Sequence, residues 1–224
     1  MVYLLLLLLE IIALYFLSRR VVRSVFHFFY QFTRRKSWGM YLFAILFLPG
    51  TFIHEISHFL AALFLLVPVG KLELIPRFKE EGGGVDLGSV AIAKTDPVRR
   101  FLIGIAPVVF GLSIIFILLY LVTMIRIMET IWEKILAGFL IFEVANSMFA
   151  SRKDLEGAAI LFIFILFVIA FLYVLGIRVP INLADLSFSQ STLELFKNAN
   201  IFLLVPIVID AVVLLFLKRL KFYN

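Results

Sequence analysis

The chain has 224 residues, of which 63% are hydrophobic and 16% charged, and its mean hydropathy is +1.11. Soluble domains are nearer about 45–50% apolar and about 25% charged, so this composition excludes an ordinary soluble fold and predicts an integral membrane protein. The lack of cysteine excludes disulfides and thiolate metal ligands, and the net charge of +6 comes from basic residues scattered among the ends of apolar runs, which does not suggest nucleic-acid binding.

Six stretches of the sequence are apolar enough to cross a bilayer, where a helix needs about 20 residues. Their approximate bounds are 2–17, 38–67, 101–125, 131–151, 158–175 and 201–217. The first has no basic region before it and no obvious cleavage site after it, so we expect a retained span. The segment 21–36 mixes basic and aromatic residues, which predicts an interfacial helix. The expected fold class is an all-α polytopic membrane protein of about six transmembrane helices.

The region 70–100 is the one substantial polar insertion. Alternating apolar and polar residues at 71–75 and 85–91, around the glycine run 82–84, predict a small β-hairpin at the membrane surface. The chain then divides into a first span with its interfacial segment (1–37), a three-span core carrying the hairpin at about 70–98 (38–157), and two further spans joined by an interfacial loop (158–224).

Orientation stays undecided at this level. Six spans put both termini on one side of the membrane, and that side collects eleven basic residues against ten on the opposite side. The positive-inside rule cannot separate such close counts.

A possible metal site lies in the second apolar stretch, at His54-Glu55-Ile56-Ser57-His58. On a helix, residues four apart share a face, so both imidazoles can hold one Zn²⁺. Glu55 adjoins the first ligand, where it can hold a metal-bound water and accept its proton. This His-Glu-x-x-His spacing is the signature of zinc proteases. The alternative is a histidine pair bonded to backbone, with Glu55 as an ordinary buried acid.

The zinc site needs a third protein ligand, because a catalytic zinc keeps three ligands and one open position. With no cysteine and only His27 left among three histidines, an acid is the expected ligand. Glu143 is one candidate, since an acid within a span is costly and is functional by default.

The three-span core resembles the site-2 protease family of intramembrane zinc metalloproteases. The resemblance rests on the His54–His58 motif, on the following span with Gly104, Pro107 and Gly111, and on Asn146 placed eight residues before Asp154. It implies that Asp154 is the third zinc ligand, that Asn146 helps to hold the extended substrate, and that the active site lies nearer the cytosolic face.

This resemblance has departures. The family's motif has proline where this chain has Phe149, and Asp-Gly where this chain has Asp154-Leu155-Glu156-Gly157; a PDZ-like insertion is also missing. Asp154 can instead be a solvated acid beside Arg152 and Lys153, and Asn146 can simply bond a neighbouring helix. The glycines and Pro107 of the third stretch are expected to allow close packing and a kink.

The expected function is intramembrane proteolysis of single-span membrane-protein substrates, with Zn²⁺ as cofactor and Glu55 as general base. An unwound substrate segment needs new hydrogen-bond partners in lipid, and an edge of the hairpin can supply them by strand addition. A multi-pass protein of the cell membrane is expected. The alternatives are a membrane metal transporter and a catalytically silent regulator that binds transmembrane helices.

Overall fold

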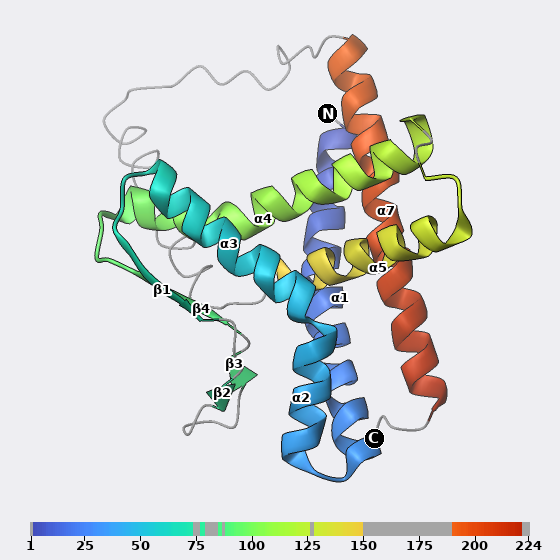
Figure 1. Cartoon of the computed structure of the whole chain (residues 1–224). Coiled ribbons are helices and arrows are strands. Elements are labelled where there is room, and N and C mark those ends of the chain that lie inside the picture. Colours follow the sequence, from blue (N-terminus) through green and yellow to red (C-terminus); the bar gives the residue numbers. More distant parts are fainter. Residues whose placement is uncertain are drawn as a thin grey trace, which may run out of the picture.

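The computed structural model describes residues 2–73, 77–78, 85–86, 88–125, 128–149 and 190–220. They form a mostly helical protein with a small antiparallel hairpin, as the sequence predicts (Figure 1). The helices are α1 (Val2–Thr33), α2 (Lys36–Leu46), α3 (Leu48–Phe64), α4 (Pro97–Tyr120) with a π-helical end (Leu121–Ile125), α5 (Ile131–Ser147) and α7 (Gln190–Arg219). The strands are β1 (Val69–Glu73), β2 (Arg77–Phe78), β3 (Val85–Asp86) and β4 (Ser89–Ile92).

Three described helices are long and apolar enough to cross a membrane: Val2–Thr33, Pro97–Thr123 and Thr192–Arg219. A fourth span results if the bent pair Ser37–Leu46 and Leu48–Phe64 is counted as one. The 17 residues of α5 are fewer than the about 20 of a typical span, and the predicted span 158–175 lies outside the described residues. The structure therefore supports an apolar helical membrane protein, and six spans are not confirmed.

The predicted span 38–67 is broken into two helices, because the chain bends by 66° between α2 and α3. Pro49 lies in the first turn of α3 and lacks the N–H that would continue the helix onto the carbonyl four residues earlier. The predicted interfacial segment 21–36 is helical as far as Thr33 and continuous with α1. Its place at the interface stays a prediction.

The helices α1 and α7 lie side by side and run in the same direction (Figure 1). Near the start of both, the Asn200 amide donates to the Tyr3 carbonyl at 2.9 Å. Further along both, Val21 and Val25 share a core cluster with Leu217. The start of α1 and the end of α7 are therefore at opposite ends of the pair, unlike the six-span count, which put both termini on one side.

The hairpin is confirmed as a structural element, with different strand bounds from those predicted. Strands β1 and β4 pair antiparallel, with Val69 opposite Ile92 and Glu73 opposite Ser89. The short strands β2 and β3 pair beyond them, so the predicted strand 85–91 is divided between β3 and β4.

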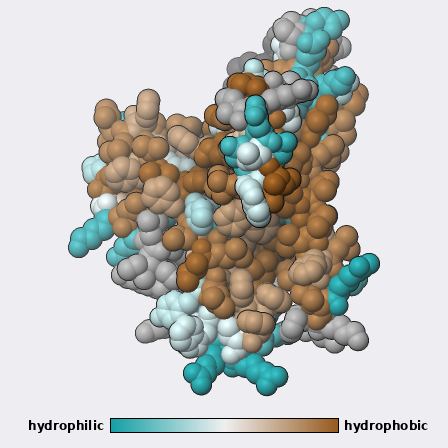
Figure 2. Space-filling view, turned by 45° about the vertical axis from the view of Figure 1, so that its right-hand side comes forward, coloured by the Kyte–Doolittle hydropathy of each residue, from teal (hydrophilic) through white to brown (hydrophobic). Residues whose placement is uncertain are grey.

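The face in Figure 2 is mostly apolar, with hydrophilic residues at the top and bottom and smaller groups at the sides and in the upper middle. Large apolar side chains are exposed on every long helix; Leu5, Ile117 and Val212 are each more than half exposed. A lipid-facing surface explains these residues, since lipid removes the cost of exposing them to water.

Candidate metal and active site

The middle of α3 carries a group of buried polar side chains. They are Thr51, His54, Glu55, Ser57 and His58, and each is at most 8% exposed. Polar groups are costly to bury in an apolar helix bundle unless another group bonds them. The partners of these side chains therefore decide what the group can do.

The two histidines of the motif face each other, as their spacing predicts. Nε2 of His54 and Nε2 of His58 are 3.3 Å apart, and the ring planes are nearly perpendicular at 88°. Two nitrogens that each bind one tetrahedral Zn²⁺ at its usual bond length are also about 3.3 Å apart. The pair therefore has the spacing expected of two zinc ligands. A direct N–H···N hydrogen bond between the two rings would have a similar spacing.

A backbone carbonyl fixes the protonation of His58. Its Nδ1 lies 2.8 Å from the carbonyl oxygen of Ile103 in α4. A carbonyl only accepts, so Nδ1 carries the hydrogen of this bond. In the neutral tautomer with that hydrogen, Nε2 presents a lone pair towards His54. Metal-binding histidines are commonly oriented by such a bond on the other ring nitrogen. The local arrangement fits a histidine that binds metal through Nε2.

Gly88 of the hairpin lies against Glu55, the general-base candidate. A Cβ atom at this position would lie 2.9 Å from Cγ of Glu55 and 3.0 Å from Cγ2 of Thr51. It would also lie 3.2 Å from the carbonyl oxygen of Glu73 at the end of β1. Glycine is therefore needed where the start of β4 covers Glu55, and the hairpin forms one wall of the site.

Glu143, the rival zinc ligand, bonds the start of α3. Its Oε2 accepts from the backbone N–H of Gly50 at 3.2 Å, and the side chain is fully buried. The N–H groups in the first turn of a helix have no partner within the helix, and lipid offers none. A carboxylate at this end also complements the helix dipole. Glu143 thus has a structural role at the break between α2 and α3.

Close helix contact makes that bond possible. A Cβ atom on Gly50 would lie 2.6 Å from the backbone oxygen of Glu143 and 3.0 Å from Cβ of Ser147. Similarly, a Cβ atom on Gly111 of α4 would lie 2.9 Å from Cβ of Met148. Gly50 thus lets the backbone of α5 approach, and Gly111 makes room for the side chain of Met148, as small residues do in membrane helices.

Asn146 bonds a neighbouring helix. Its Nδ2 donates to Oδ1 of Asp210 in α7 at 2.7 Å and to the carbonyl of Phe142 at 2.9 Å. Both amide hydrogens are used, so the remaining capacity of Asn146 is its acceptor Oδ1. That atom is buried and has no hydrogen-bond partner among the described residues. A substrate contact through Oδ1 stays a prediction.

Sequence reasoning missed Asp210, which is fully buried within α7. The available signal was an acid inside the apolar stretch 201–217, where an ionisable residue is expensive and needs a partner. Asp210 ties α7 to α5 through Asn146.

No third candidate ligand joins the histidine pair among the residues described. Asp154 lies outside them, and within the described part of the chain no three His, Cys, Asp or Glu side chains are grouped for a metal ion. Glu143 in particular does not join His54 and His58 in such a group. The choice of Asp154 therefore remains a prediction from the family resemblance.

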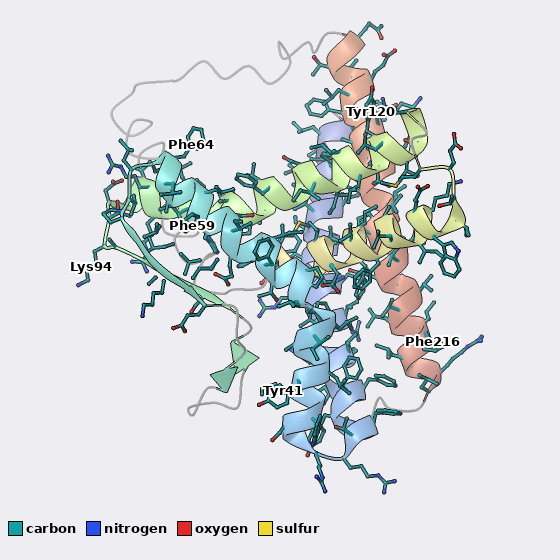
Figure 3. All side chains as sticks on the ribbon, in the orientation of Figure 1. Tyr41, Phe59, Phe64, Lys94, Tyr120 and Phe216 are labelled. Carbon is teal, nitrogen blue, oxygen red and sulfur yellow. The ribbon has the colours of Figure 1, made fainter. Side chains whose placement is uncertain are left out.

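The outward-facing residues differ in kind from those of this site. Tyr41 of α2, Phe64 of α3 and Phe216 of α7 point away from the body of the protein (Figure 3), and each is at least 53% exposed. The polar side chains of α3 are thus in the interior, while aromatic rings face the surroundings.

Comparisons with protein-family models, with curated proteins and with solved structures found no match for this chain.

Proposed function

We propose that this protein is an intramembrane zinc metalloprotease similar to the site-2 protease family. The observation that carries the proposal is the pair of buried Nε2 atoms, 3.3 Å apart on α3, with His58 oriented through its other nitrogen. Glu55 lies between them in sequence, as the protease motif requires. Bound zinc would act as a Lewis acid that polarises the scissile carbonyl and lowers the pKa of a water molecule.

Glu55 is the proposed general base. It would accept the proton of the attacking water and deliver it to the leaving nitrogen. Its burial keeps bulk water away from the carboxylate, and the wall at Gly88 limits what can approach from the hairpin side. Asp154 is the proposed third ligand. Asn146 would accept an N–H of the extended substrate through Oδ1, the capacity that its bonds to Phe142 and Asp210 leave over.

The proposed substrates are single-span membrane proteins. An unwound peptide in an apolar site needs partners for its own N–H and C=O groups. The β1–β4 hairpin ends beside Glu55, so a substrate strand that adds to it would be led to the general base.

The proposed orientation puts the basic end of the α1–α7 pair in the cytosol. Residues 18–46 hold six basic residues and no acid. Parallel packing brings Arg19, Arg20 and Arg23 close in level to Lys218 and Arg219. The positive-inside rule then assigns this end. Helix α2 extends from this basic end for 11 residues, about 16 Å, before α3 begins. In the proposed orientation the chain therefore reaches the site from the cytosolic side.

The decisive experiment combines zinc analysis with cleavage of candidate single-span substrates in proteoliposomes. The wild type should hold about one zinc per chain and cleave. Glu55→Gln should keep the zinc and lose cleavage, because an amide cannot accept the proton. The double variant His54→Ala, His58→Ala should lose both. Near-normal cleavage by Glu55→Gln would contradict the proposal.

A metal transporter is the second candidate, favoured by the buried acids Glu143 and Asp210 within helices. Metal flux into liposomes that persists in Glu55→Gln, with no cleavage by the wild type, would support the transporter.

A further inference from the structure

The carbonyl that orients His58 belongs to a special position of α4. Ile103 lies four residues before Pro107, which is inside the helix and fully buried. In a regular helix the N–H of residue 107 would donate to the carbonyl of residue 103. Proline has no N–H, so the Ile103 carbonyl is released from that bond although α4 continues to Tyr120.

A released carbonyl in an apolar interior is costly, because lipid and apolar side chains offer no donor. His58 is the donor here: its Nδ1 lies 2.8 Å from the Ile103 oxygen, and both residues are at most 6% exposed. The bond satisfies the carbonyl and fixes the imidazole at the same time. An N–H at residue 107 would compete with His58 for this oxygen.

We propose that Pro107 is a positioning residue for the metal site: by withholding a backbone N–H, it reserves the Ile103 carbonyl for Nδ1 of His58. This role rests on the proposed function in one respect, namely that Nε2 of His58 binds a metal ion. The hydrogen bond and the tautomer belong to the metal-free protein. They can be measured whether or not the protein is a protease.

The test separates the missing N–H from the proline ring. In Pro107→Ala the N–H returns. In a second variant, the α-hydroxy analogue of alanine replaces residue 107 by nonsense suppression, which gives the same side chain with an ester oxygen and no N–H. Pro206→Ala is the matched control, since Pro206 is also buried inside a helix, in α7.

Two readouts are needed. One is zinc affinity, measured by competition with a chelator in detergent. The other is the ¹⁵N chemical shift of His58 in the metal-free protein, which reports the nitrogen that carries the hydrogen. Helix content and thermal midpoint show that each variant is folded.

Pro107→Ala should weaken zinc binding by about 10–100-fold, the usual effect of losing a partner of a metal-binding histidine. It should also reduce the Nδ1–H form of His58. The ester variant and Pro206→Ala should match the wild type. Equal loss in the alanine and ester variants would overturn the proposal, because the ring or the kink would then be responsible. A wild-type zinc affinity and tautomer in Pro107→Ala would overturn it too.

Failure of the proposed function has a different signature. If the wild type binds no zinc, only the tautomer readout remains, and it still decides the role of Pro107. If the wild type binds zinc and does not cleave, the affinity series is unaffected.

Discussion

Two regions of this protein treat polar residues in opposite ways. Around α3 the polar atoms are buried and bond groups of other helices, as His58 does with the Ile103 carbonyl and Glu143 with the Gly50 N–H. Along α1 and α7 the basic side chains are mostly exposed; Arg20, Arg23 and Lys218 are examples. In a membrane, burial with a specific partner marks groups that shape a site, while exposure at one level marks anchoring to headgroups.

The largest expected effect concerns the orientation of α1 and α7 in the membrane, and it is all-or-none. The chain has no cysteine, so Ser37→Cys and Asn198→Cys each carry a single thiol at exposed positions near opposite ends of the α1–α7 pair. A membrane-impermeant maleimide added to intact cells should label Asn198→Cys and leave Ser37→Cys unlabelled. After lysis both should react. Labelling of Ser37→Cys from outside would reverse the orientation and contradict the assignment of the basic end to the cytosol.

The second expected effect tests the buried region. Glu143→Ala should destabilise the protein by about 1–3 kcal/mol, because the Gly50 N–H loses its buried acceptor. Zinc content should be unchanged. The control is Glu194→Ala in α7, where the side chain is exposed and the loss should be within about 0.5 kcal/mol. Thermal midpoints in one detergent give the comparison. If zinc is lost with Glu143, that residue is the third ligand.

A smaller effect is expected at the wall beside Glu55. Gly88→Ala adds a Cβ atom 2.9 Å from Cγ of Glu55, which shifts the base and should lower cleavage about 10-fold, or about 1.4 kcal/mol in the barrier. Zinc content should stay the same. Gly138→Ala is the control, since nothing lies within 4 Å of its added Cβ atom. Equal activity in both variants would show that the hairpin does not restrict Glu55.

The smallest effect is expected at Asp96, which precedes α4. Its carboxylate accepts from the backbone N–H groups of Arg99 and Val98. These bonds, chiefly the one from Arg99, lower the pKa of Asp96 below its usual value. A lowered folded-state pKa adds stability above the unfolded pKa, and this stability is lost as pH falls through the folded pKa. Asp96→Ala should therefore reduce the melting temperature slightly at pH 7 and not at pH 2. An equal reduction at both values would contradict this role.

The sequence predicted local features well, because they depend on neighbours along the chain. The histidine pair follows from helical spacing, and the hairpin follows from alternation around glycine. The break between α2 and α3 and the parallel course of α1 and α7 depend on contacts between distant segments. Pro107 was predicted to allow close helix packing and a kink, since nothing in the sequence shows that His58 meets the carbonyl four residues before it.

The apolar length of α7 has a consequence for the bilayer itself. Its apolar run 201–217 is 17 residues long, or about 26 Å of helix, whereas a typical hydrocarbon core is about 30 Å thick. Such hydrophobic mismatch thins the surrounding lipid and favours partition into thinner membranes. Shorter acyl chains should therefore suit this protein best, and the thinned annulus would bring water closer to any helix that approaches α3.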